Sequence, residues 1–225
     1  KTTATETFLA LTNRNDAYAQ SLTAVADEIY LQNHAKSIYL DKANSIGLEA
    51  EWAALVQNGD LNISDITDDG LKERIKNYKE WYEKALECEN ALQQLEKTQK
   101  ELTQEKIELQ VKKYDQQTTK AESEVKRIQN YVDLKEAYGG QAGKVHYKGM
   151  NKYTQKQIDY TIKQNDQLRE LQKTTTKGSE AWNEYQKRND DNNNSIKQLN
   201  KSMAENAAAK FQLTMKIHTL TGILS

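Results

Sequence analysis

Residues 81–109 read WYEKALECENALQQLEKTQKELTQEKIEL, and apolar residues recur along this stretch at every seventh position. Those at the first position of the repeat are Trp81, Cys88, Leu95, Leu102 and Leu109. The second position holds Ala85 and Leu92 and becomes polar from Gln99 onward. Residues seven apart share one side of a helix that supercoils around a partner, so the repeat predicts a packing seam. We expect this seam to be complete near Trp81 and only half apolar beyond Leu95.

The chain contains few residues that stop helices. Its 225 residues include no proline and only nine glycines, and these are the two residue types that most often interrupt a helix. The hydrophobic fraction is only 36%, which suits narrow apolar seams better than a thick core. These features predict an all-α fold of long helices and helical hairpins with coiled-coil-like packing.

The chain has 33 acidic and 32 basic residues, so its formal net charge is -1. A chain without a strong positive field lacks the electrostatic footprint of a protein that binds nucleic acid or an anionic membrane surface. No apolar stretch reaches the length needed to cross a bilayer. We therefore expect neither a nucleic-acid site nor a transmembrane span. Because the chain opens on Lys1 rather than methionine, we also expect it to be a segment of a longer protein.

Helical spacing and turn residues divide the first part of the chain into two regions. Leu22, Val25 and Ile29 share one helical face, and residues 45–47 interrupt the pattern. Residues 1–57 are therefore expected to form an N-terminal helical hairpin region of two or three helices. Residues 58–70 open with an Asn-Gly-Asp turn signal and are rich in Asp, Ser and Thr, so they are predicted to be a connector.

Residues 71–138 carry the heptad repeat and are predicted to form a long helix. If unbroken, this helix would measure roughly 100 Å. A break is expected near residues 115–119, which contain no apolar side chain. Thr119 and Glu122 have the spacing of a capping box, in which two side chains satisfy free backbone N–H groups at the start of a helix. The sequence is therefore compatible with one long helix or with two.

Residues 139–152 hold four of the nine glycines, which are Gly139, Gly140, Gly143 and Gly149. Glycine favours turns because it adopts positive φ values without steric cost. The region is therefore predicted to be a loop, and these four glycines a hinge. Their order does not match a phosphate-binding loop, because no Gly-Lys-Ser or Gly-Lys-Thr follows four spacer residues. We expect no nucleotide site here.

Residues 153–225 are predicted to form a C-terminal helical hairpin region. Thr154 and Gln157 have capping-box spacing and would open its first helix. A turn at residues 174–178 then precedes a second helix, whose apolar residues recur at spacings of three and four.

Two asparagines, Asn189 and Asn192, interrupt the apolar seam of this second helix. Asparagine in a seam is either buried, where it fixes the register of two helices, or exposed on a frayed and solvated helix. The polar run at residues 190–194 favours exposure.

The sequence offers no local catalytic or metal-binding motif. The three histidines, His34, His146 and His218, are more than 70 residues apart, and none has a base or nucleophile at motif spacing. Cys88 is the single cysteine, so it cannot form an internal disulfide, and we interpret it as a small apolar seam residue. We predict no catalytic residue, cofactor or metal ligand, and the remote alternative is an enzyme assembled from His146 and the glycine-rich loop.

Three stretches resemble a segment common in tail tape measure proteins of phages and prophages of Gram-positive bacteria. They are ANSIGLEAEW at residues 43–52, VQNG at residues 56–59 and ITDDGLKERIKNYKEWYEKA at residues 66–85. TKGSEAWNEY at residues 176–185 is similar to the family in style only. The glycines at 59, 70 and 139 depart from an uninterrupted helix and predict a segment that is partly compact.

The resemblance implies a structural role without catalytic residues. Such proteins are long helical molecules that lie inside the tail tube, set its length during assembly and leave ahead of the DNA. The implied partners are further copies of the chain, tail-tube proteins and assembly chaperones, and the implied locations are the virion tail and the host cytoplasm during assembly. The alternative function, from the same helical seams, is an interaction or stalk domain of a secreted or surface-associated protein.

Overall fold

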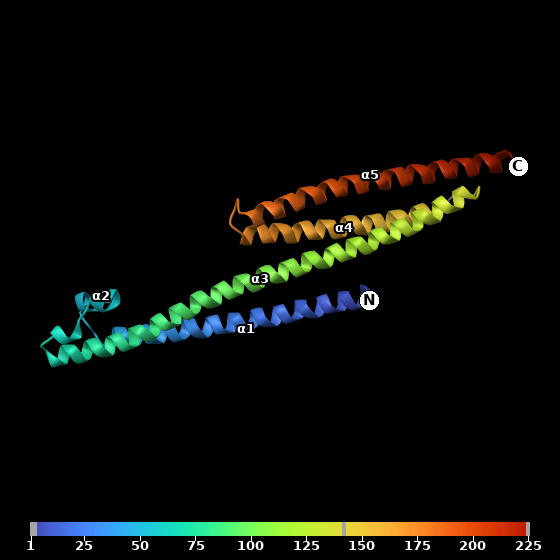
Figure 1. Ribbon diagram of the computed structural model, residues 1–225. Coiled ribbons are helices and arrows are strands. Elements are labelled where there is room, and N and C mark those ends of the chain that lie inside the picture. Colours follow the sequence, from blue (N-terminus) through green and yellow to red (C-terminus); the bar gives the residue numbers. More distant parts are fainter. Residues whose placement is uncertain (1–3, 141–142, 224–225) are drawn as a thin grey trace. The chain divides into compact units, whose positions relative to one another are not determined.

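The computed structural model describes residues 4–140 and 143–223, and within these ranges it contains helices and no β-strand (Figure 1). The elements in chain order are α1 (Ala4–Ser45), α2 (Ala50–Asn58), a short 3₁₀ helix η1 (Ile63–Asp65), α3 (Asp69–Ala137), α4 (Lys144–Thr174) and α5 (Glu180–Ile223). The all-α class is confirmed. None of the helices in the described ranges combines the length and apolar character that a membrane crossing requires.

The chain divides into two compact units whose boundaries fall inside helices. The N-terminal unit comprises residues 16–103, and the C-terminal unit comprises residues 1–15 and 104–225. Both α1 and α3 therefore contribute to each unit. The sequence-based regions were instead divided at turns. Turns mark where the chain changes direction, whereas a compact unit consists of the helix segments that pack against one another.

In the N-terminal unit, α1 and the first half of α3 lie side by side and run antiparallel (Figure 1). Lys36 forms an ion pair with Glu89, and the ring of Tyr39 stacks on that of Trp81 with centroids 5.9 Å apart. The short helix α2 joins the pair through Gln57, whose side-chain amide donates a 2.8 Å hydrogen bond to the hydroxyl of Tyr78. The buried apolar residues of this unit are Ala43, Ile66, Ile75, Tyr78, Ala85, Cys88 and Leu92.

The heptad residues of α3 are covered to different degrees. Ala85, Cys88, Leu92 and Leu109 are buried, and Trp81, Leu95 and Leu102 are half-buried. The amino groups of Lys42 and Lys84 lie 4.2 and 4.3 Å from the Trp81 ring centroid. Both cations stabilise the half-buried ring, because a positive charge is attracted to an aromatic face.

The expected break near residues 115–119 is wrong, because α3 runs without interruption from Asp69 to Ala137. The hydroxyl of Thr119 donates a 2.9 Å hydrogen bond to the carbonyl of Asp115, one turn earlier in the same helix. A side chain committed to that bond does not cap a new helix. Within this stretch, Asp115 finds partners on α4 and α5, as described below.

The predicted loop at residues 139–152 is also wrong in extent, because α4 begins at Lys144 and contains Gly149. A Cβ atom at Gly149 would lie 3.2 Å from Cδ1 of Ile128, so the glycine allows α4 to approach α3 closely. Thr154 and Gln157 are buried in the middle of α4 and do not open it. Residues 141–142 of the predicted loop lie outside the described residues.

Gly139 alone among the four predicted hinge glycines has a positive φ, of 76°. Its N–H donates a 2.9 Å hydrogen bond to the carbonyl of Glu136, which closes the end of α3. Left-handed backbone of this kind suits glycine at the end of a helix.

We expect Gly139→Ala to lower the free energy of unfolding by about 1–2 kcal/mol, because a Cβ atom disfavours the left-handed conformation. Nothing surrounds the site closely enough to clash with a Cβ atom, so the cost arises in the backbone. Gly139→Asn is the matched variant and should cost less, because asparagine tolerates this conformation. Urea unfolding followed by circular dichroism measures both changes, and equal stability of wild type and Gly139→Ala would contradict the expectation.

In the C-terminal unit, α4 and α5 form an antiparallel hairpin, and α3 from Gln104 onward lies alongside it (Figure 1). The hairpin turns at Gly178, where φ is 84°. The hydrogen bond from Gln110 to Asn15, 2.6 Å long, attaches the first part of α1 to the same unit. Val111, Leu168 and Leu171 form the buried apolar cluster of this unit, with Ile107 and Tyr185 packed against it.

Candidate functional site

The buried face of α4 is largely polar. Its buried residues are Met150, Thr154, Gln157, Ile158, Thr161, Gln164, Asn165, Leu168 and Leu171. Apolar side chains dominate at the ends of this face, and amides and hydroxyls occupy its middle. Burying such groups costs free energy unless each finds a hydrogen-bond partner. The partners of the middle section therefore decide how the three helices fit together.

A connected network of polar side chains, here called the polar junction, joins α3, α4 and α5. It consists of Asp115, Gln164, Asn165, Arg188, Asn192 and Asn193. The Asn192 amide donates hydrogen bonds to Oδ1 of Asn165 at 2.7 Å and to Oε1 of Gln164 at 2.9 Å. The Asn165 amide in turn donates to Oδ1 of Asn193 at 3.0 Å.

Asp115 connects α3 to this network. Its carboxylate accepts a hydrogen bond from the amide of Gln164 on α4. It also accepts one from the guanidinium of Arg188 on α5, at 3.4 Å. The carboxylate thus bridges two neighbouring helices, and a hydrogen bond to a charged group is stronger than one between neutral groups.

A second amide pair repeats the arrangement further along the hairpin. The Asn206 amide donates to Oδ1 of Asn151 at 3.0 Å, and the Asn151 amide donates to the carbonyl of Met203 at 3.3 Å. Asn151 lies two heptads before Asn165, and Asn206 lies two heptads after Asn192. Sliding α5 by one turn along α4 would separate both sets of partners, so the amides fix the register of the hairpin.

The expectation that the seam asparagines are exposed is wrong. Asn189 is buried with 5% of its surface exposed, and Asn192 is half-buried within the polar junction. The amide of Asn189 donates to the carbonyl of Tyr185 at 3.2 Å. The polar run on α5 favoured exposure to solvent. This prediction failed because the sequence alone does not show that Gln164 and Asn165 lie opposite the run.

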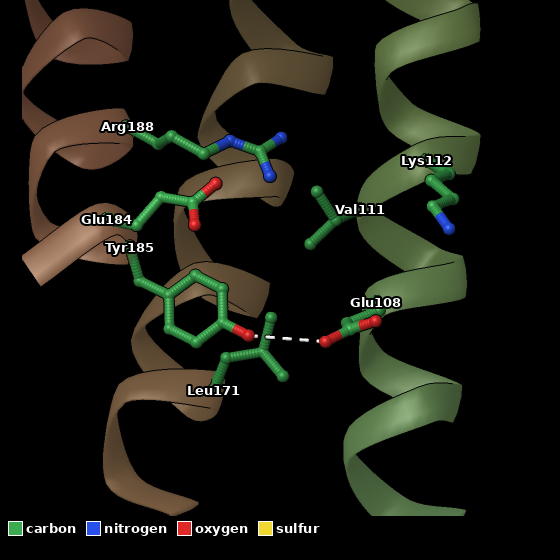
Figure 2. Close-up of a pocket in the computed structure, with 7 residues that line it drawn as sticks. All are labelled: Glu108, Val111, Lys112, Leu171, Glu184, Tyr185 and Arg188. Carbon is green, nitrogen blue, oxygen red and sulfur yellow. Dashed lines mark hydrogen bonds between the residues drawn. The ribbon is translucent and has the colours of Figure 1, made fainter. Parts of the chain in front are cut away.

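A hollow of about 210 Å³ lies beside the polar junction (Figure 2). The residues that line it are Glu108, Val111, Lys112, Leu171, Glu184, Tyr185 and Arg188. Val111 and Leu171 are almost fully buried and form its apolar part. Figure 2 shows Tyr185 reaching from α5 toward α3, where its hydroxyl donates a 3.2 Å hydrogen bond to Glu108.

Burial, followed by the nearby Glu108 carboxylate, raises the pKa of Tyr185 above its usual 10.0. A raised pKa means that the folded state favours the neutral phenol. This contribution to stability is therefore complete below pH 10 and is lost as the pH rises through the folded-state pKa. We expect the absorbance titration of wild type minus that of Tyr185→Phe to have its midpoint above pH 10. A midpoint at or below pH 10 would contradict the packing of Tyr185 described here.

His34, Cys88 and His146 each have a local environment within their own unit. His146 accepts a 3.1 Å hydrogen bond from the N–H of Gly143 at the start of α4, and its ring stacks on Tyr131 with centroids 5.1 Å apart. His34 stacks on Tyr30 in α1 of the N-terminal unit. Cys88 is a buried free thiol. The side chain of His218 lies outside the described residues.

No group of three or more His, Cys, Asp or Glu side chains that could hold a metal ion occurs in the part of the chain that the structure describes. His146 and Gly143 instead form a local cap on α4. The arrangement that the structure does build is the polar junction, which orders three helices relative to one another.

The sequence contains a signal for the polar junction that apolar periodicity alone does not reveal. The buried positions of α4 from Met150 to Leu171 follow a regular three–four spacing. That spacing is visible only when threonine, glutamine and asparagine are counted as seam residues. The spacing of apolar residues alone does not reveal this pattern.

Comparison of the chain with protein-family models, with curated proteins and with solved structures gives no match.

Proposed function

We propose that this chain is a structural segment of a phage tail tape measure protein, which sets tail length as an extended helical assembly inside the tail tube. The observation that carries the proposal is α3, which continues for 69 residues without a break. A helix converts residue number into length at a fixed rise, so the contour of α3 alone corresponds to about 100 Å. A role of this kind requires no catalytic residue.

The stretches that resemble tape measure proteins support the proposal by their position. They cover the end of α1, most of α2 and the start of α3. Two contacts join them, because Arg74 donates a hydrogen bond to the carbonyl of Gly47 and Gln57 donates one to Tyr78. The resembling residues thus lie within one packed region of the N-terminal unit.

The polar junction supports the proposal by its effect on register. A molecule that measures length must have the same axial register in every copy, and buried amide pairs penalise a shifted alignment more strongly than apolar contacts do. The proposed partners are further copies of the chain, tail-tube proteins and assembly chaperones. The proposed locations are the virion tail and the host cytoplasm during assembly.

The proposal is tested by deleting the codons for residues 1–225 in frame from the parent phage gene and measuring tails by electron microscopy. Tails should shorten by about 340 Å if all residues contribute as one extended helix, or by about 100 Å if the other helices stay folded along α3. Duplication of the same codons is the matched control and should lengthen tails by the same amount. Unchanged tails in both strains would reject the ruler function and favour a helical stalk.

A further inference from the structure

The near neutrality of the whole chain conceals two units of opposite charge. The C-terminal unit has 23 basic and 16 acidic residues, whereas the N-terminal unit has 9 basic and 17 acidic residues. Their formal net charges are therefore +7 and -8. The expectation that the chain has no nucleic-acid site rested on the sum of these charges. A positive field belongs to the surface that carries it, so the C-terminal unit is considered by itself.

Part of this positive charge forms a single row on α4, which we call the lysine ladder. Its members are Lys144, Lys148, Lys152 and Lys156. Lysines four residues apart are neighbours on the helix surface, and at 1.5 Å per residue the row has steps of roughly 6 Å and a length of about 18 Å. Lys144 is half-buried, and the other three lysines are exposed.

The lysine ladder is unfavourable for α4 by itself. Like charges four residues apart on a helix repel one another. The ladder also begins at Lys144, the first residue of α4, and the first turn holds no acidic residue. Positive charge at that end of a helix opposes the helix dipole. An anion bound along the ladder would offset both costs.

Among the described residues, no carboxylate forms an ion pair with a ladder lysine. The ladder lies alongside residues 121–133 of α3 and residues 201–213 of α5, as counted along the antiparallel helices from two close approaches. Those approaches are Gly149 to Ile128 and Asn151 to Asn206.

The carboxylates within these two stretches are bonded to other groups. Glu122, Glu124 and Glu205 form ion pairs with Lys126, Arg127 and Lys201, and Asp133 accepts a hydrogen bond from Gln129. Asp159, which follows the ladder on α4, accepts a hydrogen bond from Gln155. The fold therefore leaves the charge of the ladder uncompensated.

Two tyrosine rings contact ammonium groups on α4 without neutralising them. The Tyr153 ring centroid is 6.0 Å from the amino group of Lys152 and 5.4 Å from that of Lys156. The Tyr160 ring centroid is 6.0 Å from the amino group of Lys163, beyond the ladder. A cation attracted to an aromatic face keeps its charge. Both rings are half-buried, so part of each is open to stack on a nucleic-acid base.

The composition of the surface around the ladder favours one kind of polyanion. Between residues 146 and 161, all of which the structure describes, the exposed side chains are Lys148, Lys152, Gln155, Lys156 and Asp159. A protein interface has an apolar centre, and a helix that lies on a membrane inserts an apolar face. This surface offers neither feature. Nucleic-acid backbones are instead bound by evenly distributed cations alone.

We propose that the lysine ladder binds the phosphodiester backbone of a nucleic acid. The ammonium groups donate hydrogen bonds to phosphate oxygens and displace the counterions that surround them. Contacts of this kind fix the position of the strand and do not read its sequence. Single strands and duplexes share this backbone chemistry. The inference does not depend on the proposed function.

The test is fluorescence anisotropy of the 225-residue chain with labelled DNA, as a single strand and as a duplex, over a series of salt concentrations. The variant replaces Lys148, Lys152 and Lys156 by glutamine together, which preserves helix propensity. Its dissociation constant at low salt should rise about 10-fold or more. The slope of log affinity against log salt should decrease by about 2 for the single strand and by about 3 for the duplex, because three phosphate contacts are lost.

The matched control replaces Lys76, Lys97 and Lys100 by glutamine. These lysines are exposed in the N-terminal unit, so the control changes the total charge equally and should leave both affinity and salt slope unchanged. Circular dichroism verifies that each variant remains helical. The tighter of the two DNA probes identifies which form of nucleic acid the ladder prefers.

Three results would overturn the proposal. The first is a wild type that binds neither DNA probe. The second is a ladder variant that binds DNA as the wild type or the control variant does. The third is binding to polyglutamate, or to vesicles that contain phosphatidylserine, as tight as binding to DNA, because the ladder would then select an acidic protein or a membrane surface.

Discussion

Leu168→Ala should lower the free energy of unfolding of the C-terminal unit by about 2–5 kcal/mol. Leu168 has no exposed surface and packs in one cluster with Val111 and Leu171. Because the surrounding helices are long and connected, they cannot collapse fully into the space that the lost methyl groups leave. Urea unfolding followed by circular dichroism measures the change.

Two further variants serve as comparisons for Leu168→Ala, one at an exposed position and one at a buried position. Leu134→Ala removes the same atoms from a side chain that is 59% exposed, so it should change stability by less than about 0.5 kcal/mol. Ile75→Ala removes a fully buried side chain of the N-terminal unit and should cost about as much as Leu168→Ala, about 2–5 kcal/mol. If Leu134→Ala proved as costly as Leu168→Ala, the cluster at Leu168 would not be the core of its unit.

Asn192→Ala should destabilise the C-terminal unit by about 1–3 kcal/mol, because it removes the donor on which two buried acceptors depend. Those acceptors are Oδ1 of Asn165 and Oε1 of Gln164. The loss exceeds the net value of the hydrogen bonds because each orphaned oxygen keeps its desolvation cost. Thermal or urea unfolding gives the magnitude.

A double-mutant cycle separates the polar junction from simple packing loss. Asn165→Ala combined with Asn192→Ala should cost less than the sum of the two single changes, with a coupling of about 0.5–3 kcal/mol. Asn200→Ala, at an exposed position of α5, is the matched control and should be nearly neutral. Additive losses for Asn165 and Asn192 would show that their amides do not act together.

The local features of the fold were predictable from particular residues. The heptad from Trp81 to Leu109 and the absence of proline indicated long helices, because both act within a few turns of one segment. The interruption expected at residues 45–47 coincides with the end of α1. The turn expected at residues 174–178 lies between α4 and α5. The tape measure function stays a prediction, because it came from resemblance and no structural feature is unique to it.

The candidate site could not be predicted from local sequence features in the same way. Residues 115–119 looked like a helix break because their side chains are polar, and Asn189 and Asn192 looked solvated for the same reason. For two of these residues the outcome depended on a partner about 30 to 50 residues away in the sequence, namely Gln164 for Asp115 and Asn165 for Asn192. Periodicity within one segment carries no information about which polar groups it will meet.

The sequence by itself determined that the chain is helical and where most of its turns lie, since helix propensity, heptad spacing and glycine act locally. Only the tertiary structure decided that α3 stays whole, that Gly149 lies inside a helix and that a row of amides is buried at the centre of the C-terminal unit. The physical reason is that a buried polar group is stable only when its partner is in place, and partners are brought together by packing between helices.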